Sequence, residues 1–350
     1  MVTTSTSSTS SKDGGIRGIA AVGLAATVVV LLFVWIVGAS MSAPKAHGLT
    51  FGLVGPPAAV ATVEGAIAHA DPGGFTTSSY PDEAAARRAL ERQDIHGALV
   101  LGRGNDLLLV TGASGDATKQ ADTTVGDKIA ATSKAQLTIT DIAPLPNGDQ
   151  HGLLAFTVMV AATLAGLVFQ LLLSLRYPRL GRTRWLLSAI VFSAVAGLGA
   201  ASVADLGIGA FGGELWPVAG VAALLTLVSV TVVAALQRLL GPVGLPLSTL
   251  LLVQLGIATS GGPVPREFLP GFYRALSPYM PGSAEVLAVR RIAYLPEAPV
   301  GTELLVLILW AVAAAAVTLG VWTLRARLAE GRVTALADGP AAEVEAVVSA

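Results

Sequence analysis

The hydrophobic positions of the chain gather into long runs, separated by shorter stretches rich in arginine, proline or glycine. A helix that crosses a bilayer needs about 20 apolar residues, and six runs reach or approach that length. They cover residues of about 18–40, 153–175, 186–206, 216–237, 243–260 and 302–323. The fifth run is the weakest because it is short and contains Pro246 and Gln254. This pattern predicts an α-helical integral membrane protein with six transmembrane helices.

The first apolar run also has features of a cleaved signal peptide. Lys12 and Arg17 precede it, and the small residues of GASMSA follow its core. Its apolar core of about 22 residues is longer than the roughly 7–15 residues of a signal peptide. A retained membrane anchor is therefore the better interpretation.

Shorter apolar segments alternate with helical patterns between the first and second runs. Strands are predicted at residues 49–55, 95–102, 105–110 and 136–142, and helices at 59–70, 81–93 and 116–135. Such alternation is typical of a compact α/β unit. We therefore expect residues 41–152 to form a small extracytoplasmic α/β domain, with both of its ends close to the membrane surface.

Arginines on the short loops predict the orientation, because loops rich in Lys and Arg remain on the cytoplasmic side. The loop between the second and third runs contains four arginines and no acid: Arg176, Arg179, Arg182 and Arg184. With this loop inside, the other short basic segments lie on the same side: Arg238, Arg325, Arg327 and Arg332. The protein is then expected in the plasma (inner) membrane with both termini cytoplasmic. Residues 1–17 are predicted to be a disordered tail and residues 325–350 a second tail, while 41–152 and 261–301 are extracytoplasmic.

The proline-rich segment before the last run predicts a short helical hairpin at residues 263–294 of the five-helix membrane domain 153–324. Apolar residues recur at helical spacing in its first half, at Phe268, Leu269, Phe272 and Leu276. Residues 283–294 form a second helical pattern, and SPYMPGS between the two has the residues of a turn. We expect this hairpin to dip into the outer leaflet, with Tyr273, Tyr279 and Tyr294 at the interface.

Composition strengthens the membrane interpretation and excludes several functions. Hydrophobic residues make up 53% of the chain and charged residues 13%, about half the charged fraction of a soluble domain. Cysteine is absent and the net charge is −1, which excludes thiolate chemistry and gives no electrostatic footprint for nucleic acid. The glycines of GASGDATK do not have the spacing of a phosphate-binding loop. No cofactor, metal site or enzymatic activity is therefore predicted.

Few polar residues interrupt the predicted spans. Asp205 and Glu303 lie near outer ends, where they either contact interfacial water or relay protons. Gln170 and Gln254 could hydrogen-bond across helices. The third run carries a ridge of small residues, Ala189, Ser193, Gly197 and Ala201, which favours close packing within the chain or, alternatively, a dimer seam.

The segment SGGPVPREFLPGFYRALSPYMPGSAEVLAVRR resembles the stretch before the last span in the phage-infection-protein (YhgE/Pip) group, within the type-2 ABC exporter permeases. The matching positions are Gly261, Gly262, Pro265, Glu267, Pro270, Phe272, Tyr273, Pro278, Pro281 and Arg290. The stretch PLPNGDQHG at 144–152 is similar to the group's junction between outer domain and membrane. The order of one span, an outer domain and five spans also matches.

The resemblance implies a permease subunit that moves hydrophobic or amphipathic substrates outward, as a dimer with itself or with a related chain. ATP hydrolysis would come from a separate subunit, which the loop of Arg176, Arg179, Arg182 and Arg184 would contact. Substrate would pass the apolar helices and the residues Phe268, Phe272, Tyr273, Tyr279 and Gln254; anchoring at the interface is the alternative role of the aromatic residues. The alternative function is a non-transporting envelope scaffold or receptor whose outer domain binds a partner protein.

Overall fold

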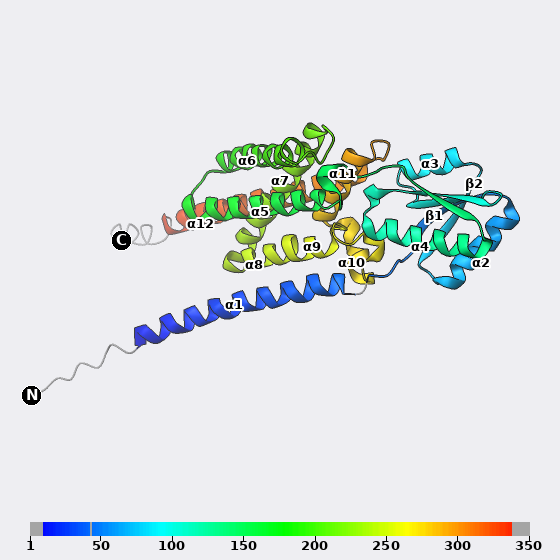
Figure 1. Cartoon of the computed structure of the whole chain (residues 1–350). Helices are drawn as coiled ribbons and strands as arrows, with labels where there is room; N and C mark the ends of the chain where they lie inside the picture. Colours follow the sequence, from blue (N-terminus) through cyan, green and yellow to red (C-terminus); the bar gives the residue numbers. More distant parts are fainter. Residues whose placement is uncertain (1–9, 43, 338–350) are drawn as a thin grey trace, which may run out of the picture.

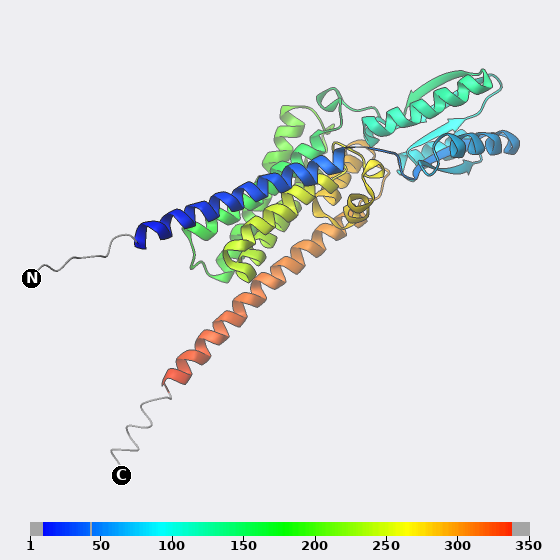
Figure 2. The same ribbon diagram turned by 90° about the horizontal axis from the view of Figure 1, so that it is seen from below.

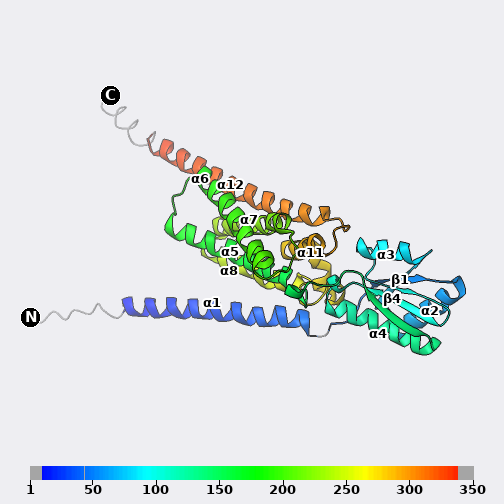
Figure 3. The ribbon, with the colours of Figure 1, turned by 45° about the horizontal axis from the view of Figure 1, so that its top comes forward.

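The structure is a computed structural model that describes residues 10–42 and 44–337. Long helices form a bundle, and a small α/β unit lies beyond one end of it (Figure 1). The start of α1 and the end of α12 lie at the opposite end of the bundle, as two further views show (Figure 2, Figure 3). The α/β unit and the two described chain ends are thus separated by the length of the helices.

Four described helical stretches are long and apolar enough to cross a membrane: Leu154–Arg176 (α5), Arg182–Gly207, Leu215–Thr259 and Gly301–Leu328. The second comprises α6 (Arg182–Ser202) and a π-helical turn, and the fourth lies within α12 (Gly301–Ala337). Large apolar side chains on their outer faces are exposed, among them Leu172, Val191, Val195, Leu309 and Val312. Exposing so much apolar surface to water is unfavourable, whereas contact with lipid is not. These are therefore the helices of a membrane protein.

The stretch Leu215–Thr259 reverses direction at Gly241, which has a φ of 62°. Before it lies α7 (Leu215–Leu240), and after it lie α8 (Gly244–Thr249), a π-helical turn (Leu250–Gln254) and α9 (Leu255–Thr259). A Cβ at Gly244 would lie 2.3 Å from the Leu236 carbonyl oxygen, so α8 packs directly against α7. The predicted fifth span is therefore a short, interrupted helix that returns along α7.

Two helices extend beyond their predicted spans. Helix α1 covers Ser10–Met41, so it begins inside the stretch predicted to be a disordered tail; residues 1–9 of that stretch lie outside the described residues. Helix α12 continues to Ala337 into the predicted second tail, of which residues 338–350 are likewise outside the described part. Helix α1 packs against α9 and the neighbouring π-helical turn, and the Gln254 side-chain amide donates to the Val29 carbonyl at 2.9 Å.

Small residues bring α5, α6 and α7 into close contact. A Cβ at Gly166 in α5 would lie 2.6 Å from the Ser229 Cβ of α7, and one at Gly197 in α6 would lie 2.4 Å from the Ala223 nitrogen of α7. The predicted ridge of α6, comprising Ala189, Ser193, Gly197 and Ala201, is buried against this neighbour. The ridge therefore serves packing within the chain, one of the two alternatives considered for it.

The α/β unit is a five-stranded sheet covered by helices on both faces. Its elements are β1 (Leu49–Val54), α2 (Pro57–Ala70), β2 (Phe75–Tyr80), α3 (Glu83–Glu91), β3 (Gly97–Val100), β4 (Asn105–Val110), α4 (Asp116–Ser133) and β5 (Gln136–Asp141). The strand order is β2-β1-β3-β4-β5, and every neighbouring pair is parallel except β3 with β4. This small α/β sheet agrees with the predicted fold class.

Alternate side chains of the sheet build two cores. Phe51 and Leu99 face α2 and α4, while Ala98 and Leu109 face α3. Strand β2, with the sequence FTTSSY, is the one strand not predicted from the sequence; it lies at the sheet edge with three of its six residues exposed and none buried. Because it has a buried neighbour on one side only, it carries no clear hydrophobic alternation.

The proline-rich segment forms short helices at the junction between bundle and α/β unit. They are a 3₁₀ turn (Arg266–Phe268), α10 (Gly271–Leu276), a second 3₁₀ turn (Ser277–Tyr279) and α11 (Pro281–Tyr294). Pro270 precedes α10 and Pro281 opens α11, where the missing backbone donor of proline costs nothing. Helix α11 packs against α5, α7, α9 and α12, so it forms part of the bundle.

The close packing of α6 on α7 gives a testable prediction. Replacing Gly197 with Leu should destabilise the protein strongly, by about 3 kcal/mol or more, because the side chain would meet the α7 backbone. The matched control is Gly199→Leu, since no atom lies within 4 Å of a Cβ at Gly199. Thermal unfolding of both purified variants in detergent checks this, and equal melting temperatures would contradict the packing.

Candidate functional site

A buried arginine holds together three segments of backbone at the junction. Arg290 of α11 is 5% exposed, and its guanidinium donates to the carbonyl oxygens of Gly261 at 2.9 Å, Gly262 at 2.8 Å and Gly152 at 2.9 Å. Gly152 precedes α5, while Gly261 and Gly262 follow α9. One side chain thus fixes the entry to α5, the exit from α9 and the helix α11 relative to one another.

Glycines make this arrangement possible. Gly261 has a φ of 71°, which residues with a side chain rarely adopt. A Cβ at Gly262 would lie 2.5 Å from a ring carbon of Phe156 in α5. The absence of a side chain therefore lets the loop after α9 approach α5 closely enough for Arg290 to reach both.

Asp149 completes the junction on the side of the α/β unit. Its Oδ1 accepts hydrogen bonds from the Leu153 and Leu154 amides at 2.8 and 3.1 Å, so it caps the start of α5. Its Oδ2 accepts a hydrogen bond from the Tyr294 hydroxyl at 2.7 Å. The carboxylate thus joins the first turn of α5 to the last turn of α11 and provides negative charge near Arg290.

Arg291 attaches the α/β unit to the last long helix. Its Nε donates to Gln93 Oε1 of the α/β unit at 2.8 Å, and its Nη1 forms a 2.9 Å ion pair with Glu303 of α12. Glu303 was predicted either to contact interfacial water or to relay protons; the ion pair with Arg291 was not predicted, and both alternatives stay predictions. Asp205, the other acid considered, accepts a hydrogen bond from the Gly213 amide at 3.1 Å.

A polar cavity of about 160 Å³ lies between the α/β unit and the hairpin. Glu267, His96, Arg290 and Arg291 are among its lining residues. The His96 Nδ1 is 2.9 Å from the Thr50 hydroxyl and its Nε2 is 3.8 Å from a Glu267 carboxyl oxygen. Burial lowers the pKa of His96, and the charge of Glu267 opposes part of this shift. The cavity is small and charged, and suits water or a small ion better than an apolar substrate.

Glu285 is a buried carboxylic acid that the sequence analysis missed. It is fully buried in α11, and neither of its oxygens has a hydrogen-bond partner. Isolation from water and from opposite charge favours the neutral acid. Its signal in the sequence was a single acid among small and apolar residues, PGSAEVLAV.

Asp122 is the corresponding buried acid of the α/β unit. It lies on α4 over Gly97 of β3, where a Cβ would be 2.6 Å from the carboxyl carbon. Both of its oxygens are buried without a hydrogen-bond partner, as is the Thr118 hydroxyl one turn earlier. Burial raises the pKa of Asp122 well above its ordinary value, which favours the neutral acid.

The structure does not bring the predicted substrate-path residues into one cavity. Phe272 and Tyr279 are exposed, at 68% and 70%. Phe268 is buried and lines one end of a groove on the α/β unit. Tyr273 stacks edge-to-face on Phe272 with ring centroids 5.4 Å apart. Gln254 is buried against α1 instead.

The residues of the predicted hairpin motif are mainly structural in their contacts. Gly261, Gly262 and Arg290 meet directly, and Glu267 reaches the same polar cavity. The remaining members of the motif set the ends of the short helices: Pro265, Pro270, Pro278 and Pro281. The motif therefore describes how the hairpin is built and attached.

The arginines of the predicted coupling loop lie on the last turn of α5, the connection to α6 and the first turn of α6, at the end of the bundle away from the α/β unit. The loop residues are Arg176, Arg179, Arg182 and Arg184. Arg179 borders a cavity of about 570 Å³ together with Arg238, Trp185 and Trp322. The Arg238 guanidinium lies over both indole rings, at 5.3 Å from Trp185 and 4.6 Å from Trp322, an arrangement that the sequence analysis did not predict.

Among residues 10–42 and 44–337, no group of three or more His, Cys, Asp or Glu side chains could hold a metal ion. Comparison of the chain with protein-family models, with curated proteins and with solved structures gives no match. The geometry of the junction and of the helices is therefore the basis for a functional proposal.

The role of Arg290 can be tested by replacing it with a side chain that has no hydrogen-bond donor. Arg290→Met should destabilise the protein by about 3 kcal/mol or more, because three carbonyl groups would lose a charged donor inside the bundle. The control is Arg274→Met on α10, because the Nη1 of Arg274 has no hydrogen-bond partner. Chemical or thermal unfolding in detergent measures both, and a small loss for Arg290→Met would contradict its role as the central clamp.

The buried Asp122 predicts a specific dependence of stability on pH. The folded state keeps this proton at pH values where the unfolded state has lost it, so the stabilisation is complete below about pH 4 and is lost as pH rises toward the raised pKa. Asp122→Asn should remove this dependence, whereas Asp127→Asn, at an exposed position of α4, should not. Melting temperatures between about pH 5 and pH 8 test this; identical pH profiles for parent and Asp122→Asn would contradict it.

Proposed function

We propose that the chain is a membrane permease subunit of the type-2 ABC exporter kind, which moves hydrophobic or amphipathic substrates outward. The observation that carries the proposal is the position of the hairpin. Helices α10 and α11 are too short to cross a bilayer, yet α11 packs among α5, α7, α9 and α12. Interrupted helices inside a bundle of membrane helices are typical of transport pathways, where other protein segments cover the irregular backbone.

The proposed topology has six crossings with the α/β unit outside the cell. Helix α1 and the returning α8–α9 segment would add two crossings to those of α5, α6, α7 and α12. The arginines around the connection from α5 to α6, together with Arg238 and Arg325, support placing that end of the bundle in the cytoplasm, because positively charged segments remain there. The plasma membrane is the proposed location.

The energy source in this proposal is a separate ATPase subunit bound to the arginine loop. Among the described residues of this chain, Arg176, Arg179, Arg182 and Arg184 are exposed on the last turn of α5, the connection to α6 and the first turn of α6. A partner with acidic residues would find complementary charge there. Dimerisation with a second copy or a related chain would close the transport path.

Export of an amphipathic dye from cells tests the proposal. Phe272→Ala should lower efflux several-fold without lowering the amount of protein, because Phe272 is an exposed aromatic residue of the hairpin that substrate would contact. The control is Trp216→Ala, since Trp216 is equally exposed but lies on α7. If efflux from cells with the parent protein equals that from cells without it, the permease function is wrong and a scaffold function becomes the better explanation.

A further inference from the structure

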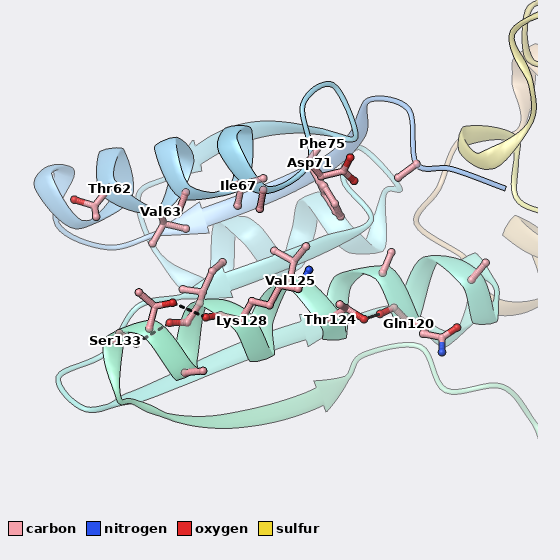
Figure 4. A pocket seen from close by; sticks show the side chains of 18 of the residues that line it. Thr62, Val63, Ile67, Asp71, Phe75, Gln120, Thr124, Val125, Lys128 and Ser133 are labelled. Carbon is pink, nitrogen blue, oxygen red and sulfur yellow. Dashed lines mark hydrogen bonds between the residues drawn. The ribbon is translucent and has the colours of Figure 1, made fainter. Parts of the chain in front are cut away.

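A wide groove lies on the α/β unit. It has a volume of about 1000 Å³ and lies between α2 and α4, on one face of the sheet (Figure 4). Ligand pockets usually have volumes of about 300–1000 Å³, so this groove is large enough for a sizeable molecule. The polar cavity at the junction is far smaller.

Apolar side chains form most of the groove. Val63, Ile67 and Phe75 line it on one side, and Val125 lines it on the other (Figure 4). Ile129, one turn after Val125 on α4, also lines the groove. Its walls carry short side chains, Ala66 and Ala70 on α2 and Ala117 and Ala121 on α4, which leave space between the helices. An elongated apolar ligand would fit such a space.

One end of the groove reaches the hairpin and the connection from α1. Phe268 of the hairpin lines it there, as do Pro44 and Ala46, which follow the end of α1. In the proposed topology this end is at the outer surface of the membrane. In that topology this end is the part of the groove nearest to the outer leaflet.

Charge is distributed unevenly along the groove. Asp71 lies nearer the hairpin, whereas Lys128 lies farther along α4 and extends into the space between the helices (Figure 4). Lys128 has an exposed side chain, and its carbon stem can cover apolar surface while its ammonium group stays solvated. An anionic group would be repelled near Asp71 and attracted at Lys128.

The part of the groove between its hairpin end and Lys128 is about as long as one leaflet, and the groove continues along α4 to Ser133. The helical rise between Ala117 and Lys128 is about 16 Å, and half of a hydrocarbon core of about 30 Å is about 15 Å. An acyl chain of a membrane lipid would thus extend from Lys128 toward the membrane and fill this part of the groove.

We propose that the groove between α2 and α4 binds the acyl chain of an anionic membrane lipid from the outer leaflet, with the headgroup at Lys128. The ligand is a lipid and not a peptide, because in the proposed topology the hairpin end of the groove lies at the membrane and the stretch from there to Lys128 is about as long as one leaflet. The proposal deepens the proposed function, on whose topology it rests, by naming the substrate class. Binding itself does not require transport.

Photolabelling of the full-length protein in nanodiscs tests the binding. The nanodiscs contain phosphatidylcholine and a small fraction of phosphatidylglycerol with a diazirine at the end of one acyl chain. Adducts are expected on α2 and α4 in addition to the membrane helices. Ala66→Trp should lower labelling of α2 and α4 about ten-fold, since excluding as few as two methylene groups from burial has that effect. The control is Ala68→Trp, at an exposed α2 position that does not line the groove.

The headgroup is tested with a second variant that leaves the groove open. Lys128→Glu should lower labelling by the phosphatidylglycerol probe and leave labelling by a diazirine phosphatidylcholine unchanged. Adducts confined to the membrane helices, or equal labelling of Ala66→Trp and Ala68→Trp, would overturn the proposal. A change of oligomeric state in Ala66→Trp with unchanged labelling would also overturn it and identify a contact between copies. If Phe272→Ala loses dye export while its groove is still labelled, export and lipid binding are separate properties, and the binding proposal stands.

Discussion

Contact with lipid along the outer faces of α5, α6 and α12 is the constraint on which the rest of the structure depends. Large aliphatic side chains cover these faces, while small residues such as Gly166 and Gly197 face the neighbouring helix. In water this arrangement would be unstable, because the apolar area would be exposed at about 25 cal/mol per Å². In a bilayer it is favourable, since helices there associate through close packing of small residues.

The same constraint explains why polar groups concentrate at one end of the bundle. The irregular backbone between α9 and α10 needs hydrogen-bond partners, and Arg290 supplies them for Gly261 and Gly262. Arg291, next in sequence, points to the α/β unit and to α12. Two consecutive arginines thus link the membrane helices to the α/β unit.

Much of the fold could be predicted from the sequence, because long apolar runs and buried strands have strong periodic patterns. The helices α5, α6, α7 and α12, and four of the five strands, lie where the pattern placed them. Strand β2 was missed because an edge strand needs few apolar residues. The predicted fifth span is interrupted by a π-helical turn, which hydropathy does not reveal.

The site was harder to predict because its partners are backbone atoms and cavities. The motif led to Arg290, but its contacts with three carbonyl oxygens depend on loops brought together from distant parts of the chain. The groove between α2 and α4 is lined by ordinary Ala, Val and Ile residues, which have no signature in a sequence. The predicted roles of Phe272, Tyr279 and the arginine loop stay predictions.

The orientation of the helices in the membrane can be measured most directly with single cysteines, because the chain has none of its own. Pro178→Cys, in the arginine loop, and Ala68→Cys, on the α/β unit, both place the thiol at exposed positions. A maleimide that cannot cross membranes should label position 68 in intact cells and position 178 only after the cells are permeabilised. Labelling of both positions in intact cells, or of position 178 alone, would contradict a bundle that spans the membrane with the α/β unit outside.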